Sequence, residues 1–324
     1  MTAMKITAGL GSADDYAAYC RAGADECFCG YVPLAWAEKY GLLTPLNRRE
    51  VSNYNVQLGA ESELKILQGM VQEYKRRVHL TFNSLYYTPE QYPVIAEIIS
   101  RCMDLGFRSF ILADPALMVY LREQNIMCEI HISGELGEIN HLAAEAFLPL
   151  MPKRIIFPRK NTPSSMEDCI KALSSQGTSL EYEAFALNEL CQFSGSFCNS
   201  FHCDELGYLC RTMYWLGNVD EHVDQMPKIP AVLEEPEEEL REDDLPPLGI
   251  TGCGLCALPE LSAAGITHLK LVGRGNHTDC MVRDIRSLRL ALDLLEESQD
   301  AVSYRTKMKS RLFVNDCPHS CYYL

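Results

Sequence analysis

Six cysteines in two neighbouring segments are the residues of this chain best suited to chemistry. Four lie within a stretch rich in Gly, Ser and Asn, and a C-x-x-C pair follows: Cys191, Cys198, Cys203 and Cys210, then Cys253 and Cys256. The stretch has neither a helical nor a strand period, whereas a buried structural cysteine usually lies alone on an apolar periodic face. Thiolates are soft ligands that select zinc or an iron–sulfur cluster. We therefore expect a metal centre in this part of the chain.

The spacing of these thiols leaves the kind of centre open. A zinc ribbon uses two tight C-x-x-C pairs, and only Cys253 and Cys256 form one. Iron–sulfur ligation tolerates wider spacing, so a 4Fe–4S cluster is favoured over Zn²⁺, and reduced thiols without a metal are the third interpretation. Cys203, which follows His202, and Cys253 are alternative ligands or neighbours of the ligands.

Composition and charge limit the class of protein. The 324 residues are 47% hydrophobic with a net charge of −15, and the 15 cysteines are an odd number, which argues against a complete disulfide framework. Without a signal peptide or a long apolar run, we expect a cytoplasmic protein with no membrane span. The acidic excess is concentrated in residues 233–247, as in a solvated linker, so net charge argues only weakly against RNA binding.

Eight short apolar or β-branched runs alternate with amphipathic helical patterns. The runs are 5–9, 26–30, 78–83, 110–114, 128–133, 154–158, 180–186 and 268–272. This alternation predicts a parallel α/β fold, a (β/α)8 TIM-barrel-like domain, rather than an open dinucleotide-binding sheet, because no GxGxxG follows the first run. We expect one barrel domain over 1–300, with an acidic insertion at 217–248 between strands 7 and 8, and a tail at 301–324 that carries Cys317 and Cys321.

A barrel of this kind carries its chemistry at the C-terminal ends of its strands. The residues at those ends are Cys29, Asn83, Asp114, His131, Arg159 and Arg274. Asp114 precedes a proline and is expected to cap the next helix. Cys27 and Cys29 are expected to pack in the barrel lumen with Phe28 towards the helices. Cys20, Cys102, Cys128, Cys169 and Cys280 follow apolar patterns and are expected in the core.

The order of motifs resembles the peptidase U32 (collagenase-like protease) family. The matching segments are GADECFCG, TFNSL, HISGELGEIN, FPRK, EAFALNELCQFSGSFCNS, GYLCR, LCALPEL and GITHLKLVGR. The resemblance runs from about Gly23 to Arg274, and its C-x3-SG-x-C element is specific. It implies four cluster ligands, Cys191, Cys198, Cys210 and Cys256. The sequence departs from the family pattern at Leu187–Glu189, at Leu136 or Glu135, and at Val272, which puts the substrate in doubt more than the cluster.

The resemblance also implies two kinds of activity. Members of the family resemble 4Fe–4S proteins that support oxygen-independent hydroxylation of an RNA base or of an aromatic quinone precursor, with prephenate as the hydroxyl donor. Arg159, Arg211 and Arg274 would suit such an anionic donor, and His131 could move a proton. The alternatives are a collagenase-like peptidase, although no G-x-S-x-G or HExxH motif is present, and a scaffold that works with a related U32 subunit.

Overall fold

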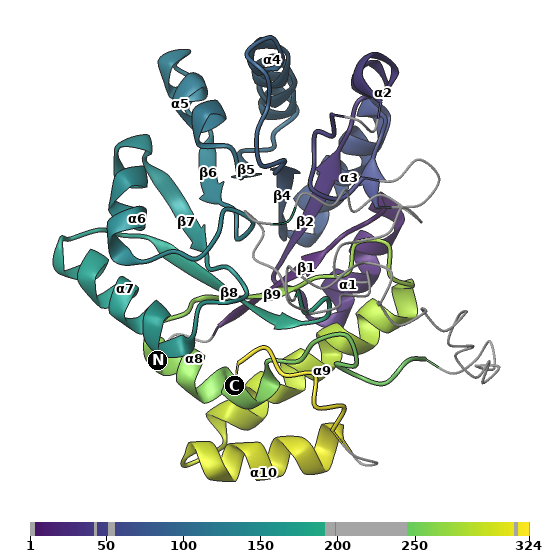
Figure 1. Ribbon diagram of the computed structural model, residues 1–324. Helices are drawn as coiled ribbons and strands as arrows, with labels where there is room; N and C mark the ends of the chain where they lie inside the picture. The colour runs from purple at the N-terminus through teal and green to yellow at the C-terminus, as the bar shows by residue number, and fades with distance from the viewer. Residues whose placement is uncertain are drawn as a thin grey trace, which may run out of the picture.

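A computed structural model describes residues 4–41, 44–50, 56–191, 198, 245–313 and 317–323. Eight parallel strands close into a barrel, because the first strand pairs with both the second and the last (Figure 1). They are β1 (Lys5–Gly9), β2 (Glu26–Tyr31), β4 (Arg77–Phe82), β5 (Ser109–Leu112), β6 (Glu129–Ile132), β7 (Pro152–Ile156), β8 (Glu181–Leu187) and β9 (His268–Leu271). The predicted (β/α)8 fold and its eight strands are confirmed.

Helices surround the barrel, as Figure 1 shows. They are α1 (Tyr16–Ala22), α2 (Leu34–Tyr40), α3 (Glu61–Tyr74), α4 (Gln91–Asp104), α5 (Pro115–Glu123), α6 (His141–Phe147), α7 (Pro163–Ser175), α8 (Leu258–Ala264), α9 (Thr278–Glu296) and α10 (Ala301–Leu312). Three short 3-10 turns accompany them in the described residues, η1 (Ala13–Asp15), η2 (Leu148–Leu150) and η6 (Leu255–Ala257). The apolar sides of the helices pack against the outer face of the strands, and this packing forms the main core.

Two features lie outside the eight-strand pattern. A two-residue strand, β3 (Gln57–Leu58), pairs with the end of β2. The helix α10 packs on α9, and its fully buried Tyr304 donates a hydrogen bond to the carbonyl of Leu255 at 2.8 Å. Most of the predicted acidic insertion, up to residue 244, lies outside the described residues. None of the described helices is long and apolar enough to cross a membrane.

The lower part of the barrel lumen is a buried ionic layer. Arg154 on β7 is 1% exposed and donates to Glu26 at 2.8 Å, to Glu181 at 2.8 Å and to Glu183 at 2.7 Å. His79 contacts Glu26 at 2.9 Å. Four strands therefore meet through paired groups of opposite charge, and Lys270 adds a second cation 2.8 Å from Glu183, as buried charges need partners.

The side chains of β2 correct one expectation. Phe28 faces the lumen with Ile111 and Phe185, whereas Cys27 and Cys29 lie in the core between the barrel and the helices. The prediction that these cysteines face the lumen was wrong. Alternation along a strand predicts which residues share a face, but it does not say whether that face is the lumen or the core. The carboxylate of Glu26 joins the lumen layer, so Phe28, two residues later, faces the lumen as well.

Other local predictions are confirmed. Asp114 caps α5, since its carboxylate accepts from the backbone N–H of Ala116 at 2.8 Å, and it also accepts from that of Tyr87 at 2.9 Å. Of the cysteines expected in the core, four are buried and Cys20 is half-buried against the same core: Cys102, Cys128, Cys169 and Cys280.

Candidate active site at the mouth of the barrel

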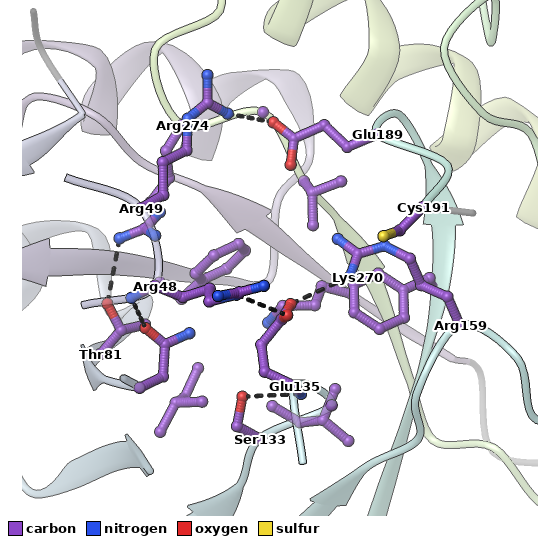
Figure 2. Close-up of a pocket in the computed structure, with 18 of the residues that line it drawn as sticks. Arg48, Arg49, Thr81, Ser133, Glu135, Arg159, Glu189, Cys191, Lys270 and Arg274 are labelled. Carbon is purple, nitrogen blue, oxygen red and sulfur yellow. Dashed lines mark hydrogen bonds and ion pairs between the residues drawn. The ribbon is translucent and has the colours of Figure 1, made fainter. Parts of the chain in front are cut away.

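A cavity of about 440 Å³ opens at the C-terminal ends of the strands. Its size is typical of pockets that hold a small molecule. Residues at or beyond the ends of several strands line it, as does the segment of residues 48–49 that follows α2. We call this cavity the mouth pocket, and Figure 2 shows its lining.

Basic side chains outnumber acidic ones among the described residues that line the mouth pocket. The basic residues are Arg48, Arg49, Arg159, Lys270 and Arg274, and the acidic residues are Glu135 and Glu189. Figure 2 shows these side chains arranged around one space. The mouth pocket therefore has a positive excess suited to an anion with more than one charged group.

One carboxylate joins two of these arginines. Glu135 accepts from Arg159 at 3.1 Å and lies 3.7 Å from Arg48. The backbone N–H of Arg48 donates to the side chain of Asn83 at 3.1 Å. The Glu135 contacts restrain both guanidinium groups and the Asn83 contact restrains the Arg48 backbone, so less side-chain entropy remains to be lost when a ligand binds.

The other arginines come from further along the rim. Arg49 pairs with Glu189, and Arg274 donates to the hydroxyl of Thr81 at 3.2 Å. Burial and the charge of Arg49 lower the pKa of Arg274 to about 10, still well above neutral pH. Burial would lower the pKa of Arg159 too, but Glu135 outweighs this and raises it. Both arginines remain charged.

An apolar floor lies beneath the charges. Phe28, Ile111, Ile156, Phe185 and Val272 form a buried cluster, and Tyr322 of the C-terminal tail packs into it. The guanidinium of Arg159 lies 4.0 Å from the centre of the Phe185 ring, and the ammonium of Lys270 lies 3.6 Å from that of Phe28. Such cation–π contacts fix the cations over the rings. A ligand with both a ring and carboxylates matches this combination.

Two glycines give the arginines room. A Cβ at Gly30 would lie 2.7 Å from Nη1 of Arg274, so the absence of a side chain on β2 admits that guanidinium. Gly273 has φ +127°, and a Cβ there would lie 2.4 Å from the Asn276 side chain. Because other residues are strained in this conformation, Gly273 allows the chain after β9 to turn Arg274 into the mouth pocket.

The predicted site residues fall into several groups. Arg159, Arg274, Asn83 and Cys191 line the mouth pocket, and the Cys191 thiol lies next to the Arg159 guanidinium (Figure 2). Cys198 is buried, and its carbonyl accepts from Arg48. Cys203, Cys210 and Arg211 lie outside the described residues.

His131 lies deeper in the barrel. It is 1% exposed and lies beside His79, with ring centres 4.6 Å apart and the ring planes tilted by 50°. Burial and the neighbouring His79 lower its pKa well below the ordinary histidine value, so the ring is neutral at pH 7. It is not among the residues that line the mouth pocket, and its role in proton transfer stays a prediction.

The implied cluster ligands can be compared with this geometry. No three Cys, His, Asp or Glu side chains in the described parts of the chain are placed to hold a metal ion. Cys191, Cys198 and Cys256 therefore do not form a shell by themselves, and Cys210 lies outside the described residues. Cys256 instead lies by the C-terminal tail, where its thiol interacts with those of Cys317 and Cys321. The implied four-ligand set, which includes Cys210, stays a prediction.

Several functional residues were missed by sequence reasoning. Arg48 and Arg49 reach the mouth pocket from a loop that carries no motif, and Tyr322 arrives from the tail. The sequence did mark Lys270 and Glu135. Lys270 is the lysine of the family motif K-x-x-G-R, and Glu135 lies at or next to the glutamine position of the motif H-x-S-x-Q.

The chain is a closed (β/α)8 barrel with a basic pocket at the C-terminal ends of its strands, where TIM-barrel enzymes carry their active sites. The sequence pattern of Peptidase family U32 matches residues 11–323. The chain belongs to the U32 family. A search of the curated proteins gives no match.

Solved structures are similar at low identity. The U32 peptidase Mk0906 is 13% identical, with a TM-score of 0.44, over 61% of this chain and 74% of that one. KGPDC from Streptococcus mutans is 8% identical, with a TM-score of 0.42, over 96% and 100%. A glycerophosphodiester phosphodiesterase from Parabacteroides distasonis is 13% identical, with a TM-score of 0.38, over 58% and 86%.

Proposed function

We propose that this U32 family member binds a small, ring-containing carboxylate donor in the mouth pocket and supports oxygen-independent hydroxylation of an RNA base or an aromatic precursor. The observation that carries the proposal is the pairing of five basic side chains with an aromatic floor in a cavity of about 440 Å³. A prephenate-like donor has two carboxylates and a ring, which are the groups this lining would recognise.

The chain's own residues would bind and orient the donor. Arg159 and Arg48, held by Glu135, would receive one carboxylate, and Arg274, which contacts Thr81, would receive the other. Phe28 and Phe185 would support the ring. Because Arg159 has a side chain only 11% exposed and lies against Phe185, most water would be excluded from that side of the donor.

An iron–sulfur cluster in the cysteine segment remains part of the proposal. Cys191 at the wall of the mouth pocket and Cys198 behind Arg48 are two ends of the segment that the family resemblance assigns to it, with Cys210 as a third ligand. Such a cluster would supply redox chemistry next to the donor.

Peptide hydrolysis is less well supported by the mouth pocket. A thiol nucleophile needs a base within hydrogen-bond reach, and no histidine is among the described residues that line the cavity with Cys191. A related U32 subunit could complete the site for the modified substrate.

Donor binding is tested by calorimetry with prephenate on the full chain. Arg159→Gln should weaken binding about 10- to 100-fold, because a charged hydrogen bond contributes about 1.5–3 kcal/mol. Arg108→Gln changes an exposed arginine outside the mouth pocket and should leave the affinity unchanged. Equal affinities in wild type and Arg159→Gln would reject the donor site.

The reaction is tested separately. Anaerobic purification with iron and sulfide analysis should give an iron-containing protein, and a colourless, iron-free protein would reject the cluster. RNA from a deletion strain should lack one hydroxylated base, and unchanged RNA would exclude RNA as the substrate.

A further inference from the structure

Lys270 is the one lysine among the described residues that line the mouth pocket. It lies on β9, the last strand of the barrel, and its side chain is 8% exposed. Its ammonium donates to Glu183 at 2.8 Å and lies 3.6 Å from the centre of the Phe28 ring. Glu183 is held in turn by Arg154 at 2.7 Å. The amine of Lys270 is therefore fixed between a carboxylate and an aromatic ring at the wall of the cavity.

The surroundings of Lys270 are those of a nucleophilic lysine. A lysine gains this character when burial or a second cation favours its neutral form. Burial lowers the pKa of Lys270, and the charges of Arg154 and Arg274 act in the same direction, against the ion pair with Glu183. The neutral amine is therefore more populated at Lys270 than at a lysine on the surface.

A carboxylate-binding group lies next to this amine. A Cβ at Gly9 would lie 3.2 Å from the tip of the Phe28 ring and 3.4 Å from Cγ of Arg274, so the ring and the arginine adjoin each other there. Lys270 lies over the same ring, and Figure 2 shows Lys270 and Arg274 around the same cavity. A carboxylate bound to Arg274 would place the next atom of the ligand on the side of Lys270. In an α-keto acid, that atom is the ketone carbon.

We propose that Lys270 is a nucleophile that forms an imine with the ketone of a ring-containing α-keto acid in the mouth pocket. The inference rests on the donor site of the proposed function and deepens it, because a prephenate-like donor carries such a ketone beside one of its carboxylates. The aromatic floor accepts the ring, Arg274 holds the carboxylate, and Lys270 reacts with the group between them.

The step needs no oxidant or reductant. The ammonium first releases one proton to solvent, and the neutral amine then attacks the ketone carbon. A C–N bond forms, the C–O bond breaks, and the oxygen leaves as water with the two protons that the nitrogen loses. The protonated imine draws electrons from the adjoining carbons, so the bound donor would be both anchored and activated.

Reductive trapping on the full chain tests the proposal. Phenylpyruvate is the probe because it has a ring, a carboxylate and a ketone, and cyanoborohydride converts an imine into a stable secondary amine. Peptide mapping should find the label on Lys270. Phenylpropionate lacks the ketone, so it should give no label by itself and should suppress the label when present in excess. No label on Lys270, or labelling of exposed lysines to the same extent, overturns the proposal without requiring any variant to fold.

Two variants sharpen the result. Lys270→Arg keeps a cation beside Glu183 but has no primary amine, so it should lose the label while its affinity for phenylpropionate stays within about threefold of wild type. Lys153→Arg is the matched control, because the Lys153 side chain is 43% exposed on the neighbouring part of the barrel wall, and it should be labelled like wild type. Labelling of the Lys270→Arg protein at the wild-type level would overturn the proposal.

Calorimetry separates this proposal from the donor site itself. A wild type that binds phenylpropionate but takes no label would reject the imine and leave the donor site in place. A label on Lys270 together with equal prephenate affinity in wild type and Arg159→Gln would reject the assigned donor contacts and leave the imine. A wild type that binds neither ligand and takes no label would reject both.

Discussion

The pKa values of two buried carboxylates in this chain are shifted in opposite directions. Burial alone would raise the pKa of Glu183, but Lys270 and Arg154, at 2.8 and 2.7 Å, outweigh it and lower the pKa to about 2. Glu50 lies beside the mouth pocket, 3% exposed, where burial raises its pKa to about 7 despite the Asn47 N–H and the charge of Arg274. Glu183 therefore lies between two cations, one of which, Lys270, also lines the mouth pocket, whereas Glu50 accepts from a backbone N–H.

The largest effect is expected in the lumen layer. Arg154→Met leaves Glu26, Glu181 and Glu183 without their shared partner and should lower the free energy of unfolding by about 3–5 kcal/mol. Chemical denaturation measures this. Lys153→Met, at the exposed neighbouring position, is the control and should change stability by less than about 1 kcal/mol. Equal losses in the two variants would contradict a special role for the layer.

Acid should weaken the same layer through Glu183. Its folded pKa of about 2 lies below the ordinary value of 4.5, so its contribution is present above pH 4.5 and is lost as pH falls towards 2. The loss should be about 3 kcal/mol. Unfolding curves between pH 5 and 2 measure it, and a Glu183→Gln variant with the same pH slope as wild type would refute the assignment.

Glu50 should show the opposite pH dependence. Its raised pKa means that stability is lost as pH rises from about 4.5 through about 7, because the folded state favours the protonated acid. Glu50→Gln should therefore stabilise the protein by up to about 3 kcal/mol at pH 8 and change little at pH 4. Thermal unfolding at both pH values distinguishes this from a pH-independent gain, which would show that Glu50 is not the titrating group.

The smallest effect should follow from one methyl group. Gly30→Ala would place a Cβ 2.7 Å from Nη1 of Arg274 and displace that guanidinium from the mouth pocket. Donor affinity should fall about fivefold, equivalent to about 1 kcal/mol. Calorimetry with prephenate checks this, with Gly69→Ala on α3, where a Cβ meets nothing within 4 Å, as the control. An unchanged affinity would mean that Arg274 does not contact the donor.

Much of the barrel could be predicted from the sequence, because each strand is a short apolar run between turns. The sequence did not predict β3, because a strand of two residues is too short to show an alternating pattern. The side of the strand on which Phe28 lies was predicted wrongly, because alternation alone does not distinguish the lumen face from the core face. Arg159 and Arg274 were found because they follow strand ends. Arg48 and Tyr322 were not, since only tertiary folding brings a loop and a tail to the mouth pocket.

The connection between β8 and β9 has a consequence for how the family can vary. Leu187 and Leu271 are neighbours in the sheet, although the chain between them includes the acidic segment. The entropy cost of closing a flexible loop grows only with the logarithm of its length, by about 0.6 kcal/mol per doubling. Insertions between these two strands are therefore thermodynamically cheap, and this position can gain or lose long segments during evolution while the barrel stays closed.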